Sequence, residues 1–439
     1  MSLHQRQVAS MDLTASARAR RIVQRVFRGY PGGLAVRLWD GDTLNVGAGI
    51  PVFTLVIRDP ALVREMVLHR DPLRLAEAYF QGRLDVEGDL YAALALKDHF
   101  QSLKLSLAER AMFLLTALSF SGAPAANCQT TPQSAQPRAR RLWRAHSKAA
   151  NRQAIAFHYD VSNTFYRLWL DEQMVYSCAY FESSDDSLDQ AQRNKLDHIC
   201  RKLRLKPGER LLDIGCGWGA LIHWATKRYG AQAHGITLSR NQYDHARDII
   251  RDEGLQDRAT VELRDYRDLE GQACYDKIVS VGMFEHVGIE NLPQYFSIAR
   301  RLLKPGGLFL NHGITHDREG WGKTAGTRFI NRYVFPDGEL DTIGNVQRAM
   351  EQTDFEILDV EGLRRHYALT LRHWVERLED RKAEAQRLVP ESIYRIWRLY
   401  MAGCALQFDQ GAIGVYQILA ANRGGGPEPV PLTRRDLYI

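Results

Sequence analysis

The sequence predicts an α/β protein in which a parallel β-sheet is covered by helices on both faces and is preceded by a smaller α+β domain. Three observations lead to this fold class. Strand and helix signals alternate after residue 150, a glycine-rich turn follows the first clear strand of that region, and a proline-rich segment separates the region from a short mixed one. With 439 residues and 45% apolar content, the chain can build a core in each of two domains.

The second half of the chain carries the alternating signals. Helices are expected to end near Tyr229 and Glu253, between segments rich in β-branched and aliphatic residues. The expected strands are residues 210–214, 231–237, 260–263, 277–281 and 308–312. Because strand and helix units alternate, the strands should lie parallel, with the connecting helices on both faces of the sheet.

The first half of the chain predicts a small mixed domain. Residues 52–58 (V-F-T-L-V-I-R) favour a strand, and helical stretches are expected around residues 60–70 and 89–98. Residues 121–137 contain three prolines, no charge and no large apolar side chain, which is typical of an exposed connector.

These signals predict three parts of the chain. The first part would associate with lipid, with a membrane or with a second copy, the second would link the domains through a basic run, and the third would be catalytic. Their expected bounds are residues 1–120, 121–150 and 151–439.

Positive charge is concentrated in the first 150 residues, although the net charge of the whole chain is only +6. Residues 12–28 place Leu13, Val23, Val26 and Phe27 at helical spacing, opposite much of the charge. This arrangement is typical of a helix on an anionic bilayer, but a solvated helix face is an equally good interpretation. No nucleic-acid motif accompanies the charge, so we expect no nucleic-acid partner. The basic clusters are Arg18, Arg20, Arg21, Arg25 and Arg28, then Arg138, Arg140, Arg141, Arg144, Lys148 and Arg152.

No segment of the sequence predicts a membrane span. The best apolar stretch, Ala111 to Phe120, has about half of the roughly 20 residues that a spanning helix needs. The amino terminus has no apolar segment typical of a secretory signal, so we expect a cytoplasmic protein, peripherally associated with the inner face of the membrane. The six cysteines form no C-x-x-C pair, and neither they nor the histidines have the spacing of a metal site.

The strongest local signal is L-L-D-I-G-C-G-W-G, residues 211–219. Gly215, Gly217 and Gly219 let the backbone turn tightly and approach a ligand. The spacing G-x-G-x-G differs from the dinucleotide fingerprint G-x-G-x-x-G, and Asp213 lies two residues ahead of the first glycine. This favours S-adenosylmethionine, whose cationic amino-acid portion would contact the loop and the carboxylate, over a nucleotide or a purely structural turn.

The second expected strand ends without the acidic residue that often holds ribose hydroxyls. Thr237, Ser239 and Gln242 follow it and offer neutral donors and acceptors for a diol or an adenine edge. Ser239 could equally cap the following helix. After the third strand of the alternating region, the residues expected to flank an adenine are Asp265, Tyr266 and Arg267.

Several ordered motifs carry a resemblance to a known family. They include H-Y-D-V-S-N-T-F-Y from His158, M-V-Y-S-C-A-Y-F, G-I-T-L-S-R-N-Q, S-V-G-M-F-E-H-V-G, L-N-H-G-I-T, R-H-Y-A-L-T-L and C-A-L-Q-F. With the glycine turn, they make the region from His158 onward similar to the cyclopropane-fatty-acyl-phospholipid synthases, which include the mycolic acid cyclopropane synthases. The resemblance implies a Rossmann-like methyltransferase domain. In the first half only F-T-L-V-I-R-D-P and E-A-Y-F-Q-G match, and these are less specific.

The resemblance also implies a reaction and its residues. A cis double bond of a phospholipid acyl chain would attack the sulfonium methyl group, and the resulting cation would be stabilised by aromatic faces, including Tyr159 and Tyr176. A bound bicarbonate would then remove a proton so that the ring closes. The implied bicarbonate pocket consists of Cys178, Glu285, His312, the backbone at Ile314, and Tyr367. Cys404 also matches a family cysteine, and Tyr176 and Ser177 match cofactor contacts.

Other functions stay open at this point. The same first step could end in a methylene- or methyl-branched chain, and a methyltransferase fold could instead bind lipid without activity. A soluble metabolite could also accept the methyl group. Unsaturated phospholipid chains are the favoured partner, and a homodimer is left open.

Overall fold

A computed structural model gives the fold of the chain. It describes residues 3–69, 71–118, 120, 148, 162–322, 324–336, 338–423 and 430–438, with the backbone alone over residues 3–14. The chain forms two compact units. The expected linker, residues 121–150, lies outside the described residues apart from Lys148, so the predicted domain bounds stay a prediction.

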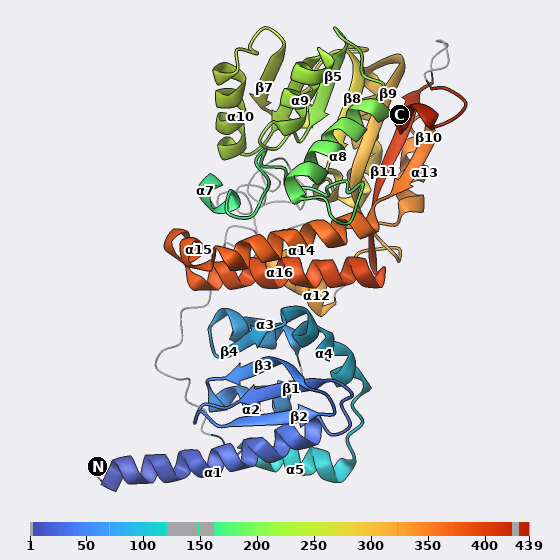
Figure 1. The fold of residues 1–439 in the computed structure, drawn as a ribbon. Coiled ribbons are helices and arrows are strands. Elements are labelled where there is room, and N and C mark those ends of the chain that lie inside the picture. Colours follow the sequence, from blue (N-terminus) through green and yellow to red (C-terminus); the bar gives the residue numbers. More distant parts are fainter. Residues whose placement is uncertain are drawn as a thin grey trace. The chain divides into compact units, whose positions relative to one another are not determined.

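The first unit contains a mixed four-stranded sheet in the order β2-β1-β3-β4 (Figure 1). β1 runs antiparallel to β2 and parallel to β3, and β4 runs antiparallel to β3. The strands are β1 (Gly33–Arg37), β2 (Thr43–Gly47), β3 (Pro51–Ile57) and β4 (Leu84–Gly88). The expected strand over residues 52–58 is therefore confirmed as β3.

The amino-terminal part of this unit also contains five helices among the described residues. Asp71 and Asp89 cap α3 and α4 by accepting hydrogen bonds from backbone N–H groups of the first turn. The helices are α1 (Leu3–Val26), α2 (Pro60–His69), α3 (Pro72–Phe80), α4 (Leu90–Ser102) and α5 (Leu107–Leu118).

Two later segments of the chain, Thr324–Phe329 and Pro390–Gly403, also belong to the first unit. Arg395 pairs with Asp85 at 3.0 Å, and only 7% of its side chain is exposed. Burial of a paired charge makes its loss costly, so Arg395 should matter for the stability of this unit.

The apolar face of α1 packs into the core of its own unit. Val23 and Phe27 are buried in a cluster with Leu34, Val36 and Leu62. The interpretation in which these side chains face a bilayer is therefore wrong, because the sheet of the same unit covers them. The side chain of Leu13 lies outside the described residues.

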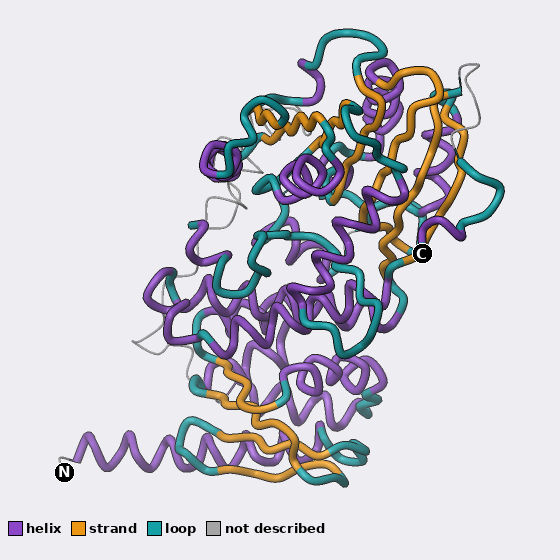
Figure 2. The backbone as a smooth tube through the Cα atoms, turned by 45° about the horizontal axis from the view of Figure 1, so that its top comes forward, coloured by secondary structure: helices purple, strands orange, loops and turns teal. Residues whose placement is uncertain are grey.

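The second unit is built on a seven-stranded sheet in the order β10-β11-β9-β8-β5-β6-β7 (Figures 1 and 2). The five strands from β9 to β7 are parallel, which confirms the predicted core of the fold. The strands are β5 (Arg210–Ile214), β6 (Gln232–Thr237), β7 (Ala259–Leu263), β8 (Tyr275–Val281), β9 (Leu303–His316), β10 (Phe355–Gly362) and β11 (Ile413–Asn422).

The expectation of a wholly parallel sheet is wrong at one edge. β11 runs antiparallel to both β9 and β10. The last strand enters between two earlier strands and in the opposite direction, which an alternation of local signals does not encode. β9 is also longer than the five residues expected for it, because its carboxyl half pairs with β11.

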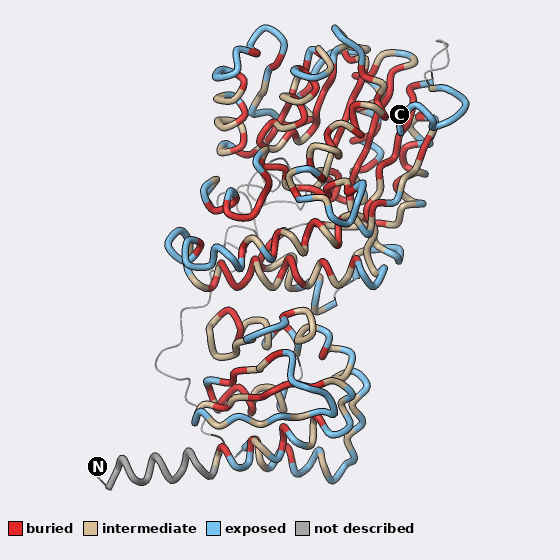
Figure 3. Tube along the Cα trace, in the orientation of Figure 1, coloured by how far each residue is buried: buried red, intermediate tan, exposed pale blue. Residues whose placement is uncertain are grey.

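Both faces of this sheet are covered by helices, and its strands are largely buried (Figure 3). Leu211 and Val279 pack with α8 and α9 on one face, while Leu212 and Ile278 pack with α11 on the other. This alternation follows from the two-residue period of a strand. The helices of the first half of this unit are α7 (Asn163–Tyr166), α8 (Leu188–Lys202), α9 (Ala220–Tyr229), α10 (Arg240–Asp252) and α11 (Leu292–Leu302).

The remaining helices follow β9. They are α12 (Ala325–Tyr333), α13 (Ile343–Glu351), α14 (Arg364–Asp380), α15 (Lys382–Leu388) and α16 (Glu391–Gln410). No helix among the described residues is long and apolar enough to cross a bilayer. Strand order reverses between β5 and β8, and ligands of open α/β sheets bind beyond the carboxyl ends of the strands at such a point.

Candidate active site

The glycine turn after β5 forms the floor of a pocket at this reversal. Gly215, Gly217 and Gly219 have φ angles of 85°, 55° and 89°, which a residue with a Cβ rarely adopts. A Cβ on Gly215 would lie 2.8 Å from Met283 Cγ, whereas none of the surrounding atoms lies within 4 Å of such a Cβ on Gly217. Gly215 and Gly217 therefore line the pocket, while Gly219 packs against Ala246 on α10.

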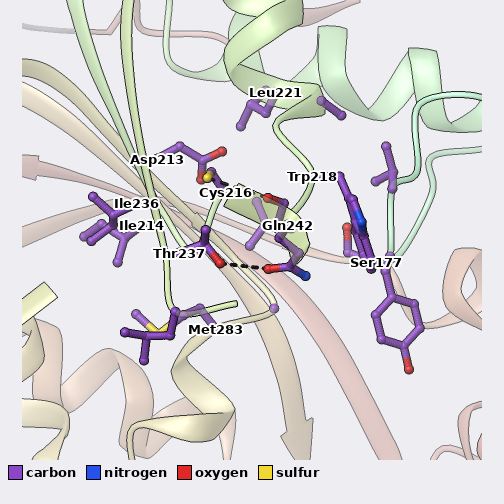
Figure 4. Close-up of a pocket in the computed structure, with 18 of the residues that line it drawn as sticks. Ser177, Asp213, Ile214, Cys216, Trp218, Leu221, Ile236, Thr237, Gln242 and Met283 are labelled. Atoms are coloured by element: carbon purple, nitrogen blue, oxygen red, sulfur yellow. Dashed lines mark hydrogen bonds between the residues drawn. The ribbon is translucent and has the colours of Figure 1, made fainter. Parts of the chain in front are cut away.

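The pocket is bounded by the carboxyl ends of β5, β6 and β8 (Figure 4). Residues expected to bind the cofactor that line it are Tyr176, Ser177, Asp213, Gly215, Gly217, Thr237, Gln242, Asp265 and Tyr266. Gly219, Ser239 and Arg267 were expected there as well but are not among the lining residues.

At the end of β6, a hydroxyl and an amide face each other. Thr237 Oγ1 donates to Gln242 Oε1 at 2.8 Å (Figure 4), which leaves the amide NH₂ of Gln242 for a ligand acceptor. Ser239 caps α10, because its Oγ accepts from Gln242 N at 3.4 Å. Of the two interpretations of Ser239, the structure therefore supports the helix cap.

At the end of β7, Arg267 holds Asp265 in place. Its Nε and Nη2 donate to the Asp265 carboxylate at 2.8 and 2.6 Å. Burial alone would raise the pKa of Asp265, but the hydrogen bonds from Arg267 outweigh it and lower that pKa. Asp265 is thus an ionised acceptor on the pocket wall, and Arg267 orients it from behind.

A buried lysine, which sequence reasoning missed, lies in the same pocket. Lys195 on α8 is 2% exposed, and its Nζ donates to Ser177 Oγ at 2.9 Å. Burial lowers the pKa of Lys195 to about 8, against the attraction of Asp171, Cys178 and Asp213. Burial likewise raises the pKa of Asp213 to about 7, opposed by Lys195.

The sequence did contain a signal for Lys195. It occupies the face of α8 that also carries Ala191, Leu196 and Ile199, all of which are buried. Lysine is rarely buried without a compensating polar partner, and Gln192 and Lys202 on α8 are buried as well. A buried ammonium with one neutral hydroxyl partner suits an anionic ligand group, and a carboxylate such as Asp213 suits a cationic one.

A second buried pair lies beyond the end of β8. Glu285 follows β8 directly, and its Oε1 accepts from Ile314 N at 2.8 Å. Burial raises the pKa of Glu285 to about 7, although the hydrogen bond from Ile314 opposes the shift. Its Oε2 is buried and has no partner among the described residues.

His312 lies on β9, opposite the last residue of β8. Burial lowers the pKa of His312 to about 3, helped by the positive charges of Lys195 and Lys202, so the ring is neutral. Gln417 Nε2 lies 3.2 Å from His312 Nδ1, and a donating amide there leaves the ring proton on Nε2. This buried Nε2 has no partner among the described residues. Sequence reasoning missed Gln417.

Cys178 and Tyr367 meet at the backbone of Leu363. The Cys178 thiol donates to Ala179 O at 3.3 Å and to Leu363 O at 3.8 Å, and Tyr367 N donates to the same Leu363 carbonyl at 3.1 Å. Burial raises the pKa of Cys178, so the group stays a protonated thiol. A covalent thiolate mechanism is therefore disfavoured.

Aromatic rings surround Tyr176. Its ring centroid lies 5.4 Å from that of Trp169 and 5.2 Å from that of Trp374, and Tyr367 contacts Trp374 at 6.0 Å. Sequence reasoning missed both tryptophans. Tyr159 lies outside the described residues, and Cys404 is a half-buried cysteine on α16.

Comparison with known proteins decides the family. Residues 146–418 match the mycolic acid cyclopropane synthetase family, and residues 23–102 match a domain family of unknown function. The chain belongs to the mycolic acid cyclopropane synthetase family.

Individual relatives agree with this assignment. The chain is 43% identical over 409 residues to a probable fatty acid methyltransferase from Pseudomonas putida, which covers 92% of this chain and 96% of the relative. It is 40% identical over 262 residues to the cyclopropane-fatty-acyl-phospholipid synthase of Escherichia coli K12, covering 60% of this chain and 66% of the relative.

A solved structure shows the same fold. The crystal structure of mycolic acid cyclopropane synthase CmaA1 with SAH and CTAB superposes with a TM-score of 0.58 at 37% identity. The match covers 63% of this chain and 98% of that chain. This member of the mycolic acid cyclopropane synthetase family is thus an S-adenosylmethionine-dependent methyltransferase, as the glycine turn predicted.

The pocket of this synthetase-family protein fits that cofactor. The open space above Gly217, the free amide of Gln242 and the oppositely charged Lys195 and Asp213 offer partners for each end of an amino acid bearing a nucleoside. The expected catalytic residues divide into two groups. Glu285 contacts the backbone of Ile314, with His312 two residues earlier on β9, and Cys178 and Tyr367 meet at Leu363.

Proposed function

We propose that the protein transfers a methyl group from S-adenosylmethionine to a cis double bond of an unsaturated phospholipid acyl chain and closes a cyclopropane ring. One observation carries the proposal. Glu285, in the turn after β8, and His312, on β9, are buried groups whose neutral forms burial favours, and each has a polar atom without a partner among the described residues. The names of the relatives from Pseudomonas putida and Escherichia coli support an acyl substrate.

S-adenosylmethionine, when bound, would supply the carbon from its sulfonium methyl group. We infer that Asp213 holds the ammonium of its amino-acid portion and that Lys195, with Ser177, holds the carboxylate. Both side chains are 2% exposed, so ionic hydrogen bonds there are strong. Thr237, Gln242 and Asp265 hold the nucleoside.

The methylated chain carries positive charge on one carbon, and the aromatic rings stabilise it. Tyr176 lines the pocket and offers a π-face that does not react with a carbocation, and such a ring contributes about 0.5 to 2 kcal/mol. Trp169 and Trp374 pack against Tyr176 and hold its ring in place. The surrounding burial also excludes water, which would otherwise trap the cation as an alcohol.

Ring closure requires loss of a proton from the transferred carbon, and none of the expected catalytic side chains that the structure describes is a strong ionised base. Glu285 has a raised pKa, His312 is a weak base with a pKa of about 3, and Cys178 stays protonated. Neutral donors of this kind fit a small anion. Bicarbonate, when bound, would supply the proton acceptor. The unpartnered Glu285 Oε2 and His312 Nε2 are the groups best suited to hold it. The family resemblance implies Cys178 and Tyr367 as further members of the same pocket.

Ile314 has a different part in this proposal from the one first expected. Its backbone N–H donates to Glu285 Oε1, so it fixes the carboxyl group. Gln417 fixes the imidazole in the same way. Both therefore orient the two groups that hold the anion.

Product analysis tests the proposal directly. The purified protein is incubated with S-adenosylmethionine, bicarbonate and vesicles of a mono-unsaturated phosphatidylglycerol, and the extracted lipid is examined by proton NMR. Cyclopropane ring protons are expected. Their absence together with methyl transfer would overturn ring formation, and the absence of any transfer from labelled cofactor would overturn the whole proposal.

A second product deserves the same experiment, because the relative that covers 92% of this chain is named a fatty acid methyltransferase. If the proton leaves from a different carbon, the chain ends as a methylene- or methyl-branched acyl group. The NMR spectrum then shows branched methyl or exomethylene signals in place of ring protons. Repeating the reaction in bicarbonate-depleted buffer tests the base: turnover that is unchanged would count against the anion.

A further inference from the structure

Helix α5 in the first unit exposes an apolar surface. Of its twelve residues, only Phe113 and Ala117 are buried. Five large apolar side chains face solvent, and most of these are more than half exposed. They are Leu107 (84%), Met112 (45%), Leu114 (45%), Leu115 (71%) and Leu118 (63%).

The exposed side chains of α5 form one continuous face. At 100° per residue, Phe113 and Ala117 point toward the core and the five exposed side chains lie on the opposite arc, together with Ala108 and Ala111. The charged residues of the helix, Glu109 and Arg110, lie outside this arc, on the two sides that flank Phe113 and Ala117. A surface helix normally has the reverse pattern, with its polar side toward water.

A row of arginines on α1 lies beside this face. Arg18 and Arg21 are exposed on one side of α1 because of their helical spacing, and Arg28, also exposed, follows two residues after the helix ends. Arg25, in the same row, pairs with Glu109 of α5, which joins the row to that helix. Among the described residues, Arg18, Arg21 and Arg28 form no ion pair, whereas Arg20 on another side of α1 pairs with Asp42 at 2.7 Å.

We propose that the apolar face of α5 and the arginine row of α1 form a docking surface for an anionic phospholipid bilayer. The apolar side chains would enter the boundary between head groups and acyl chains, while the unpaired guanidinium groups would contact lipid phosphates. This inference rests on the proposed function in one respect: an enzyme that modifies phospholipid acyl chains must reach its substrate at a membrane.

Charge separates the bilayer from a second copy of the chain as the occupant. A two-fold contact through α5 would bring the arginine row of one protomer toward the same row of its partner, with no acidic row to match it. An anionic membrane offers the complementary charge. The surface also differs from the one first expected, because the apolar side of α1 is buried and only its arginines remain available.

The test measures binding without chemistry. Vesicles of dimyristoylphosphatidylglycerol contain no double bond, so sedimentation of the full-length protein with them reports docking alone. Two variants are compared with the wild type: L114S/L115S/L118S removes apolar area, and R18Q/R21Q/R28Q removes charge. Leu388→Ser on α15, at a side chain that is 42% exposed, is the matched control.

We expect the leucine variant to lose at least about tenfold in vesicle affinity and the arginine variant on the order of a hundredfold at low salt, with L388S unchanged. Neutral dimyristoylphosphatidylcholine vesicles should bind the wild type more weakly than the anionic ones. Circular dichroism should show the same fold for all variants, because every replaced side chain is exposed or half-buried on a helix surface.

Wild-type affinity in both triple variants would overturn the docking surface. A smaller particle for the leucine variant than for the wild type, measured by light scattering without lipid, would instead assign α5 to a contact between copies and would also overturn it. Activity on detergent-dispersed substrate separates the two proposals. Vesicle binding that needs this surface in a protein that makes no cyclopropane would sink the proposed reaction and leave the docking surface standing.

Discussion

The cofactor pocket and the region of Glu285 and His312 lie beside neighbouring strands of one sheet, but their buried ionisable groups are partnered differently. In the pocket, Lys195 and Asp213 are buried with opposite charges that attract each other, and burial moves both pKa values toward neutrality. Within the part of the chain that the structure describes, Glu285 and His312 have no partner of opposite charge in hydrogen-bond contact, and burial favours the neutral form of each. The first arrangement suits a zwitterionic ligand, and the second suits a small anion that brings its own charge.

A substitution of Glu285 tests the difference between these two regions most directly. Glu285→Gln keeps the shape but removes the acid, so we expect turnover to fall about a thousandfold, while the affinity for S-adenosylhomocysteine changes less than about twofold. Transfer from labelled cofactor and calorimetric titration measure the two quantities. Glu290→Gln, on an exposed side chain five residues later, is the control and should behave as wild type. An equal loss of cofactor affinity in Glu285→Gln would show that the two regions are not separate.

Lys195 tests the other side of the comparison. Lys195→Met removes a buried cation from the pocket, so the dissociation constant for the cofactor should rise by about ten- to a hundredfold, with turnover at saturating cofactor falling less. Lys206→Met, at an exposed position after α8, should leave both unchanged. Thermal melting checks that the variant is folded. An unaltered dissociation constant would remove Lys195 from the cofactor site.

The raised pKa of Glu285 also predicts a pH dependence of stability. The folded state holds the Glu285 proton up to about pH 7, whereas an unfolded chain releases it near the ordinary value of 4.5. Stability from this group is therefore complete at low pH and is lost as the pH rises through that window, by about 1.4 kcal/mol for each pH unit. Urea unfolding at pH 5 and pH 7 should show a steeper decline for wild type than for Glu285→Gln. Parallel curves would contradict the raised pKa.

Ser239 gives the smallest expected effect and sharpens the boundary of the cofactor pocket. Ser239→Ala removes the cap of α10 and should cost about 1 kcal/mol of unfolding free energy, without a change in cofactor affinity. A weakened cofactor with unaltered stability would restore Ser239 as a ligand.

The parts of the fold that sequence patterns predicted are those with local causes. β5 was expected at residues 210–214 and occupies Arg210–Ile214, because a buried strand followed by a glycine turn leaves a signal within a few residues. The same holds for β6 and for the cap at Ser239. The structure also places Glu285 against the backbone of Ile314, two residues after His312 on β9, while the shared pocket that the family motifs implied for them stays a prediction.

The missed parts depend on contacts distant in sequence. Gln417 orients His312 only because β11 pairs with β9, which lies about a hundred residues earlier in the chain. The apolar side of α1 could not be assigned to a core or to a bilayer until the sheet that covers Val23 and Phe27 was known. The exposed face of α5 was missed for the opposite reason. The apolar composition of a helix predicts that the helix is buried, and its exposure becomes known only from the structure.

The pairing of β11 with β9 also orders events during synthesis of the chain. His312 and Glu285 emerge from the ribosome long before Gln417, and until residues Ile413–Asn422 follow, β9 lacks its partner on one side. The glycine turn and its pocket walls, complete by Val287, precede His312 and Gln417. We therefore expect a nascent chain to acquire the means to hold its cofactor well before the imidazole is fixed, so that the protein becomes competent for chemistry only as its last strand closes the sheet.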